Sequence, residues 1–188
     1  MPKPDKTKLR KWDFDTFKQH HTTGDAYTQL TDLPKSVKEI IDVENSENLI
    51  IQHNNELAYT QVSDQAKHDG VIIEGLSEAL VNHSDLVQKY FMTKAVDVDE
   101  HRLTALHTAL VNGGIFVYVP KNTVVEHPIQ YVVLHDDEQA SFYNHVIIVT
   151  EESAEVTYVE NYLSTTSGED NQLNIVSEVI AGANSNVT

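Results

Sequence analysis

Short apolar segments recur at nearly constant spacing through the second half of the chain, from Gly113 to Ser164. Each segment has the length of a β-strand, is rich in β-branched or aromatic residues, and is separated from the next by polar or turn residues. A period of about 13–14 residues without a helical pattern predicts a sheet built by repetition, such as a barrel, a sandwich or a solenoid. The strand candidates are Ile115–Val119, Ile129–Leu134, Phe142–Val149 and Val156–Val159.

The chain of 188 residues is strongly acidic, with 13 lysines and arginines against 29 aspartates and glutamates and a formal net charge of −16. Five of its basic residues lie within the first eleven positions, so the remainder is more acidic still. Such a body repels phosphate backbones, and a basic segment this short is too small to bind one alone. We therefore expect no nucleic-acid partner.

The sequence also lacks features of secreted and membrane proteins. It has no cysteine, which excludes disulfides, thiolate metal ligands and a cysteine nucleophile within this sequence. No apolar run approaches the roughly 20 residues that a bilayer requires, and the first residues lack the apolar stretch of a signal peptide. These features predict a cytoplasmic protein that does not enter a membrane.

The first half of the chain carries mixed helix and strand signals and differs from the second. Its clearest helix is predicted over Val98–Asn112, where Asp97 and Glu100 can form a reciprocal capping box and leucines recur on one face. Two glycines stop this helix, since glycine accepts the left-handed conformation that ends helices. We place a domain boundary at the stop, with a mixed α+β region over residues 1–112 and a strand region over residues 113–188.

Shorter elements are predicted ahead of that helix from local apolar runs and turn residues. Two strands are joined by a polar turn, a third strand follows, and a glycine separates it from a further helical stretch. The predicted strands are Leu49–Ile51, Leu57–Val62 and Val71–Ile73, and the predicted helices begin near Trp12, Pro34 and Leu76.

Ten histidines make a metal site the first chemical hypothesis to consider. None lies in the i, i+4 arrangement with a carboxylate that a zinc-binding HExxH helix requires. His101 and His107 would lie on different faces of the predicted helix, and His135 with Asp137 supplies only two ligands on one side of an extended segment. Hydrogen-bonded or solvated histidines are the favoured interpretation, and we predict no metal-binding residue.

Two other patterns are superficially similar to catalytic sites. Gly75–Ala79 follows a strand and opens a helix, as the GxSxG nucleophile elbow does, but Ser77 lies where a helix N-cap is usual. The acidic pairs Asp136–Asp137 and Glu151–Glu152 lie in predicted turns, where we expect them to be solvated, and a glycosidase pair is defined by its separation in space. The sequence has no glycine-rich phosphate loop. We predict no catalytic or cofactor-binding residue and no enzymatic activity.

Several motifs from Gly70 onward carry a family resemblance. They begin with a glycine, an apolar strand and several helical stretches. A segment with glycine, tyrosine and proline residues follows, and then further strands. This arrangement resembles the SufB/SufD proteins of iron–sulfur cluster assembly, and its most specific part begins at the paired glycines. The matching segments are Gly70–Ile73, Leu76–Leu80, Leu86–Phe91, Leu103–Leu110, Gly113–Lys121, Glu126–Ile129, Val146–Val149 and Ser153–Glu160.

Two positions bear on the branch of the family that the chain resembles. Glu160 is followed by Asn161 and Tyr162, where SufB-like proteins tend to carry a glycine–cysteine pair, and this favours the SufD branch. His145 stands where the family often has an arginine. The resemblance implies an α+β N-terminal region followed by the first coils of a right-handed parallel β-helix, in a considerably longer protein.

The function implied by the resemblance is that of a non-catalytic scaffold subunit in a SufBCD-type complex. Its partners would be a SufB-like paralogue and a SufC-like ATPase, contacted through regions largely beyond this segment. The complex would handle an iron–sulfur cluster, with no cofactor bound by this segment. A carbohydrate-binding or carbohydrate-acting β-helix protein stays open as an alternative, because aromatic residues such as Tyr118, Tyr131 and Tyr143 commonly meet sugars. A purely structural or interaction module is a third.

The pattern of strands continues to the last residues without a capping element. Leu173–Val176 and Val179–Ile180 are strand-like, and Asn184–Thr188 begins another alternation. Because a solenoid needs a cap over its last apolar face and free strand edge, we expect a chain cut within a repeat, which self-associates through its C-terminal strands. The residues expected in the inward stack are Ile115, Val117, Val119, Val133, Ile147 and Val159.

Overall fold

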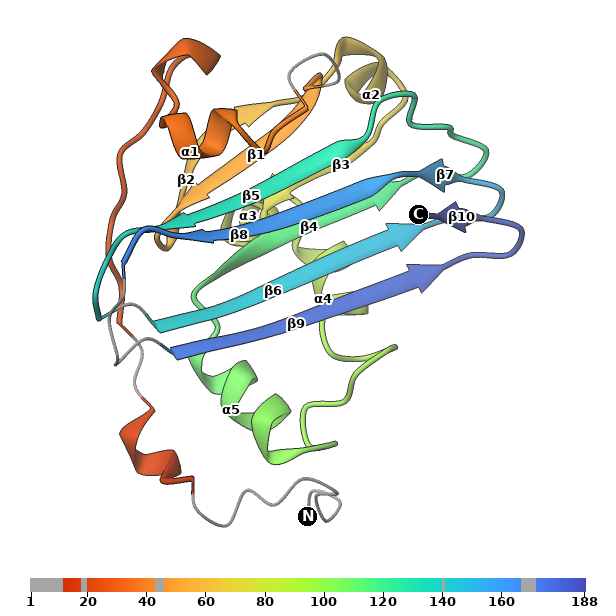
Figure 1. The fold of residues 1–188 in the computed structure, drawn as a ribbon. Helices are drawn as coiled ribbons and strands as arrows, with labels where there is room; N and C mark the ends of the chain where they lie inside the picture. The colour runs from red at the N-terminus through yellow and green to blue at the C-terminus, as the bar shows by residue number, and fades with distance from the viewer. Residues whose placement is uncertain (1–11, 18–19, 43–45, 140, 167–171) are drawn as a thin grey trace.

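The computed structural model describes residues 12–17, 20–42, 46–139, 141–166 and 172–188. Within these residues, strands form two four-stranded sheets and one two-stranded sheet (Figure 1). The strands are β1 Asn48–His53, β2 Glu56–Gln61, β3 Ile72–Gly75, β4 Gly113–Val119, β5 Ile129–His135, β6 Ser141–Thr150, β7 Glu155–Val156, β8 Tyr158–Ser164, β9 Gln172–Ala181 and β10 Asn186–Val187. The helical segments are η1 Phe14–Thr16, η2 Leu30–Asp32, α1 Lys35–Lys38, α2 Asp64–His68, α3 Leu76–Asn82, α4 Ser84–Tyr90 and α5 Arg102–Leu110.

The two large sheets combine antiparallel and parallel pairs, so the architecture is mixed α+β. The first sheet has the order β2-β1-β5-β8, in which β1 and β2 form the predicted hairpin and the other neighbours are parallel. The second sheet has the order β3-β4-β6-β9, which is antiparallel between β3 and β4 and parallel after that. The described strands from β4 onward therefore do not form an antiparallel meander.

From β4 onward the chain passes back and forth between the sheets. Strands β4, β6 and β9 follow one another in the second sheet, β5 and β8 in the first, and β7 and β10 in the small sheet. Each new segment therefore pairs in parallel with one from the previous passage, as Figure 1 shows for β4, β6 and β9. This repetition is the one that the spacing of the apolar segments predicted.

Both large sheets contain strands from each side of residue 113. Strand β3 pairs with β4 in the second sheet, and β1 pairs with β5 in the first. Strand pairing therefore crosses the predicted boundary in both large sheets. The division into residues 1–112 and 113–188 stays a prediction.

The main apolar cluster lies between the two large sheets. Ile115, Val117 and Val119 of β4 and Val133 of β5 are buried in it, as predicted. Ile147 of β6 is also fully buried, but it belongs to a different cluster on the other face of the second sheet, where helices α3 and α4 pack. The helices thus cover the outer face of this sheet, while the first sheet covers its inner face.

Val159 is 42% exposed, and the prediction that it lies in the inward stack is wrong. Strand β8 pairs with β5 so that Tyr158 lies beside Ile129 and Tyr162 beside Val133. Side chains alternate between the faces of a strand, so the two tyrosines share the inward face with Ile129 and Val133. Val159 points to the opposite face for the same reason.

Strand boundaries differ from the prediction at the C-terminal end. The expected strand Val156–Val159 is divided, because its first residue belongs to β7 and its last two to β8. The expected strands Leu173–Val176 and Val179–Ile180 are parts of one continuous strand, β9, which pairs with β6 along its whole length. Pairing with β6 keeps Ser177 and Glu178, the polar residues between the two expected strands, in an extended conformation.

Helix α5 begins at Arg102 and not at Val98. Its N-cap is His101, whose ring nitrogen accepts a backbone N–H of the first turn, while the Thr104 hydroxyl accepts the His101 N–H at 3.0 Å. The prediction of a capping box at Asp97 is therefore wrong. The physical reason is that His101 and Thr104 supply the capping box four residues later, while a carboxylate on β9 accepts two backbone N–H groups of the preceding loop.

The first helical segment is shorter than expected, whereas the second is the short element that Pro34 predicts. The helix predicted near Trp12 is the single turn η1, and residues 18–19 of that stretch lie outside the described residues. The helix predicted at Pro34 is α1, in which Val37 is buried and after which Ile40 is 36% exposed. In the described ranges no helix combines the length and the apolar character needed to cross a bilayer.

Candidate functional site

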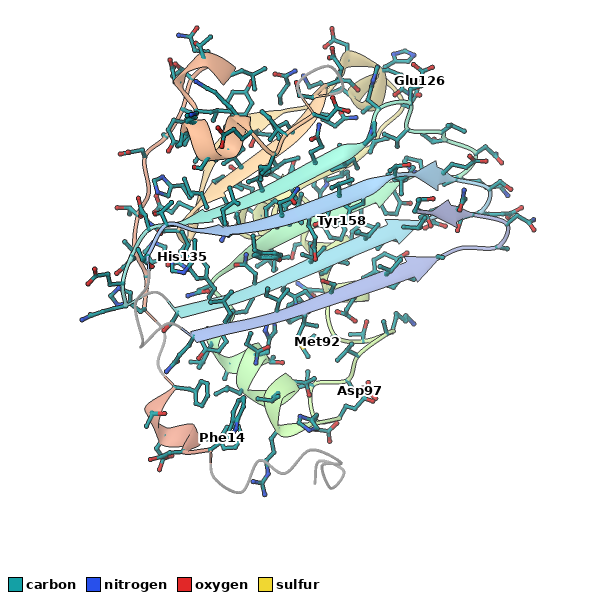
Figure 2. The ribbon with its side chains drawn as sticks, viewed as in Figure 1. Phe14, Met92, Asp97, Glu126, His135 and Tyr158 are labelled. Atoms are coloured by element: carbon teal, nitrogen blue, oxygen red, sulfur yellow. The ribbon has the colours of Figure 1, made fainter. Side chains whose placement is uncertain are left out.

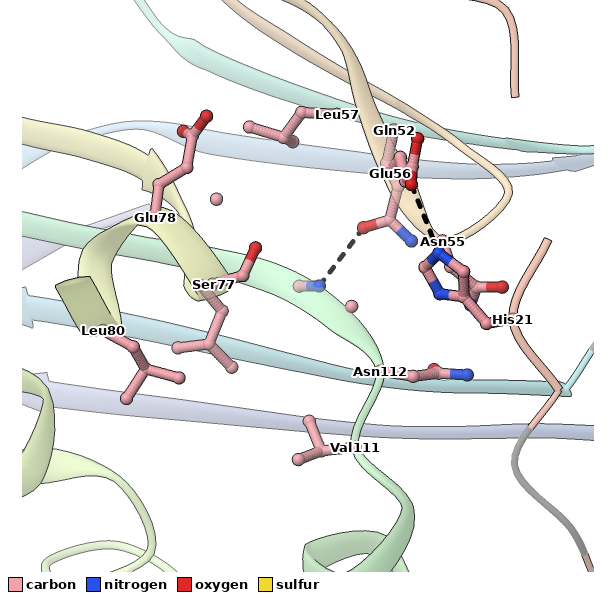
Figure 3. A pocket seen from close by; sticks show the side chains of 14 residues that line it. His21, Gln52, Asn55, Glu56, Leu57, Ser77, Glu78, Leu80, Val111 and Asn112 are labelled. Carbon is pink, nitrogen blue, oxygen red and sulfur yellow. Dashed lines mark hydrogen bonds and ion pairs between the residues drawn. The ribbon is translucent and has the colours of Figure 1, made fainter. Parts of the chain in front are cut away.

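A cavity of about 470 Å³ lies where the β1–β2 hairpin, the β3–α3 turn and the start of β4 come together (Figure 3). Apolar side chains from three elements form its walls, and polar side chains lie at its rim and base. Its volume is in the range of about 300–1,000 Å³ that is usual for small-molecule sites. The apolar wall residues are Leu57, Leu76, Leu80 and Val111.

Glycines form the base of the cavity and allow strands to approach closely there. Gly114 has a φ of +131°, and a Cβ at this position would overlap the backbone of His145 on β6. A Cβ on Gly75, at the end of β3, would lie 2.7 Å from the Leu57 Cδ1 atom. The cavity is therefore bounded by backbone at its base, and larger residues there would displace the neighbouring strands.

Gln52 reaches beneath these glycines from β1 and is almost wholly buried. Its side-chain nitrogen donates to the Asn54 carbonyl at 2.7 Å and to the Asn144 side-chain oxygen at 3.1 Å. Its oxygen accepts the Gly114 N–H at 3.2 Å and the Tyr131 hydroxyl, and burial holds the pKa of Tyr131 well above its ordinary value. The amide is fully used inside the fold, so Gln52 joins strands and leaves ligand contacts to the rim.

Two carboxylates and an imidazole lie at the rim. His21 Nε2 is 3.2 Å from Glu56 Oε1, and Glu78 lies across the cavity on α3 (Figure 3). Ser77 also faces the cavity from α3, but the prediction that it caps this helix is wrong, because the N-cap is Gly75 and no side chain bonds there. Among the described contacts no histidine bonds to the Ser77 hydroxyl, as a base that activates a serine nucleophile would.

A second polar arrangement is buried on the helix side of the second sheet. Glu178 of β9 accepts the backbone N–H of Met92 at 2.7 Å and that of Val96 at 3.1 Å, and its Oε1 lies 2.9 Å from His145 Nε2. The other ring nitrogen of His145 lies 3.0 Å from His107 Nε2. We call Glu178, His145 and His107 together the buried relay. It connects β9, β6 and α5 with the loop that contains Met92, which Figure 2 labels below β9.

The surroundings of the buried relay set its charges. Burial and the neighbouring His145 lower the pKa of His107 to about 4, so this ring is neutral at pH 7. Burial alone would raise the pKa of Glu178, but the hydrogen bonds from His145 and from two backbone N–H groups lower it below its usual value. The relay runs in a line, and among the described residues no three histidines or carboxylates are arranged to hold a metal ion.

Sequence reasoning missed Glu178. His145 drew attention only because it replaces a family arginine, and His107 because it lies on a predicted helix. The available signal is a lone carboxylate within the apolar residues of a strand, with valine and isoleucine after it. A buried carboxylate without partners is costly, so such a residue indicates a buried partner elsewhere in the chain.

His135 and Asp137, which the sequence offers as two ligands on one side of an extended segment, contact different groups, and the His135 ring packs beside Phe142. Asp137 Oδ2 lies 2.9 Å from His20 Nε2 and accepts the Thr22 hydroxyl, and the bond from Thr22 is the main cause that lowers the Asp137 pKa to about 2. Asp136 lies 2.9 Å from a ring nitrogen of His53. His135 itself is buried, and burial lowers its pKa.

The second acidic turn is also hydrogen-bonded, and one carboxylate of each pair stays exposed to solvent as predicted, Asp136 at 49% and Glu152 at 51%. Glu151 Oε1 accepts the hydroxyls of Tyr90 and Tyr118 at 3.3 and 3.2 Å. Glu152 lies 2.7 Å from the Lys121 ammonium group. These contacts attach the turn after β6 to α4, β4 and the turn after β4.

Two family models match adjacent parts of the chain. Residues 26–131 match the N-terminal region of SufBD proteins, and residues 132–188 match the SufBD core domain of the SUF system of FeS cluster assembly. The first match alone covers more than half of the chain. Both large sheets contain strands from each matched part.

Curated relatives agree with these matches. The iron-sulfur cluster assembly protein SufD of Bacillus subtilis is 49% identical over 189 residues, which cover 100% of this chain and 43% of the relative. An iron-sulfur cluster assembly SufBD family protein of Pyrococcus horikoshii is 30% identical over 70% of this chain and 31% of its own length. The chain thus spans less than half the length of these relatives. It belongs to the SufBD family and is SufD-like along its whole length.

Proposed function

We propose that this protein is a subunit of an iron–sulfur cluster assembly complex of the SufBCD type. The observation that carries the proposal is the similarity to the Bacillus subtilis SufD protein, at 49% identity along the whole chain. The match to the SufBD core domain, which is named for the SUF system of FeS cluster assembly, supports the same assignment. The cluster is the cargo of the complex, and this segment contributes no ligand to it.

The role that we propose within the complex is that of a non-catalytic scaffold. The side chains best suited to acid–base chemistry are used to hold the fold together. Glu178 binds two backbone N–H groups and His145, and the Ser77 hydroxyl has no base bonded to it among the described contacts. A group already committed to a buried hydrogen-bond network is poorly placed to act on a substrate.

We further propose that the repeated parallel strands are the first coils of a right-handed parallel β-helix that continues in the complete protein. The passage of the chain between sheets and the parallel pairing of β4, β6 and β9 support this proposal. The partners would be a SufB-like paralogue and a SufC-like ATPase, bound through regions largely beyond this segment, in the cytoplasm.

Co-purification of the full-length protein tests this function. We expect the tagged protein to retain both a SufB-like paralogue and a SufC-like ATPase when the three are co-expressed, and an unrelated ABC-type ATPase to be lost on washing. A full-length protein that retains neither partner would contradict the proposal. Saccharide-dependent thermal shifts would favour the carbohydrate alternative, although Tyr131 and Tyr143 are fully buried and are not available to stack on a sugar.

A further inference from the structure

The cavity at the β1–β2 hairpin combines an apolar interior with an anionic rim. Leu57, Leu80 and Val111 line it from three different elements, and Leu80 is 48% exposed although it is a leucine. Exposed leucines are ordinary when they lie singly, but this one continues an apolar wall that leads into the cavity. The interior therefore suits an apolar group several carbons long.

The charge at the rim is negative on both sides. Glu56 and Glu78 line opposite sides, and among the described residues that line the cavity none is a lysine or an arginine. His21 pairs with one oxygen of Glu56 and leaves the Glu78 carboxylate without a described ion-pair partner. The chain as a whole carries a formal net charge of −16, which adds to the local field. An anionic ligand such as phosphate or a carboxylate is disfavoured here.

We infer that this cavity binds a basic side chain, arginine or lysine, presented by a partner protein. Such side chains bury an aliphatic stem against apolar surface and keep the charged head near water, which matches an apolar wall with carboxylates at its edge. The cavity volume of about 470 Å³ leaves room beside one side chain for its neighbours. Exposed Leu80 then offers contact to an apolar residue that flanks the basic one.

The occupant is a protein and not a free amine, because the site has two separate parts, the carboxylates at the rim and the apolar wall. The carboxylates attract the cationic head group to the rim. The wall of Leu57, Leu80 and Val111 offers apolar contact over a longer span than a small amine fills. The backbone base at Gly113 and Gly114 is closely packed, because an added Cβ there would overlap Asn144 or His145. A preformed site of this kind loses little entropy when a partner docks.

The test uses the full chain and a blocked tripeptide, leucyl-arginyl-leucine, with the citrulline tripeptide as the neutral isostere. Binding is followed by the amide resonances of Gly113 and Gly114 in heteronuclear NMR spectra. We expect the arginyl peptide to shift both resonances and to bind up to about fivefold more tightly than the citrulline peptide. The difference should shrink as salt is raised, because surface charges are screened.

Two matched variants assign the effect to the rim. Glu78→Gln should bring the affinity for the arginyl peptide close to that for the citrulline peptide, whereas Glu138→Gln, the same charge change at an exposed turn, should leave the ratio unchanged. Equal binding of both peptides by the unchanged protein would overturn the inference, as would shifts confined to residues outside the cavity, an absence of shifts, or the same shifts with inorganic phosphate. Loss of SufB-like or SufC-like partners from the full-length protein would bear on the proposed function alone.

Discussion

The two ends of the stacked strands differ in how their apolar side chains are covered. At one end the β1–β2 hairpin, β3 and the helices close the stack, and Ile50 and Ile73 are at most 3% exposed. At the other end β9 has no further strand beside it among the described residues, and Leu173, Ile175 and Val179 are 37–51% exposed. The same residue types in the same kind of strand thus differ in burial only through what packs next to them.

The largest expected effect comes from placing a charge at a buried apolar position of β6, compared with the same change at an exposed apolar position of β9. Ile147→Asp buries an unpaired carboxylate at a site with 0% exposure, and we expect it to cost several kcal/mol and to prevent stable folding. Val179→Asp, at a site that is 47% exposed, should change stability by less than about 1 kcal/mol. Ile147→Val should cost about 1 kcal/mol. Thermal unfolding followed by circular dichroism measures all three, and a folded Ile147→Asp variant would refute the burial of this strand.

The next largest effect concerns the buried carboxylate on the outermost strand. Glu178→Ala removes the acceptor of two backbone N–H groups and of His145, and we expect a loss of about 3–5 kcal/mol in the free energy of unfolding. Glu138→Ala at an exposed turn is the matched control and should be nearly neutral. Hydrogen exchange at the Met92 and Val96 amides should accelerate only in the Glu178 variant. Unchanged protection of these amides would show that the relay does not hold the loop.

Acidification should weaken the same relay. The pKa of His107 is lowered to about 4 in the folded protein from an ordinary value of 6.5, so the unfolded chain binds a proton between these values and the folded chain does not. Stability contributed by this group is therefore complete above pH 6.5 and is lost progressively as the pH falls towards 4. Urea unfolding at a series of pH values should show this dependence reduced in His107→Gln and retained in His68→Gln, an exposed histidine. Equal pH dependence in both variants would exclude His107 as its source.

The smallest expected effect is weak self-association through the uncovered end. Its exposed apolar side chains and free strand edge favour a second copy of the chain as the neighbour, while the acidic surface opposes it, so low salt should weaken the association. Ile175→Lys should reduce the apparent mass in a light-scattering concentration series, and Val124→Lys, at an exposed valine away from β9, should not. A monomer at all concentrations would mean that the exposed end is tolerated without a partner.

Local patterns predicted the strands better than they predicted the faces that those strands present. Alternation and spacing placed β4, β5 and β6 within a few residues, because strand formation depends on neighbouring residues along the chain. The same reasoning placed Val159 inward, where the register of β8 with β5 puts Tyr158 and Tyr162 instead. A shift of one residue in register exchanges the two faces, and register depends on the partner strand.

The candidate sites were beyond prediction for a related reason. The cavity brings together residues of the hairpin, α3 and β4, and the buried relay joins Met92 to Glu178 across 86 positions of sequence. Sequence motifs predict Ser77 as a helix cap, yet the N-cap is Gly75, two positions earlier, and the serine lies at the cavity. Hydrogen bonds between distant segments leave little trace in the local pattern.

The sequence by itself determined the strand-rich second half, the helices that precede it and the membership of the SufBD family, because these follow from local periodicity and from motifs of adjacent residues. The tertiary structure alone decided that Ile147 faces helices, that α5 is capped by His101, and that Glu178 is buried with His145. The physical reason is that burial and charge pairing are properties of neighbours in space. A strand acquires those neighbours only when its register and the covering elements are in place.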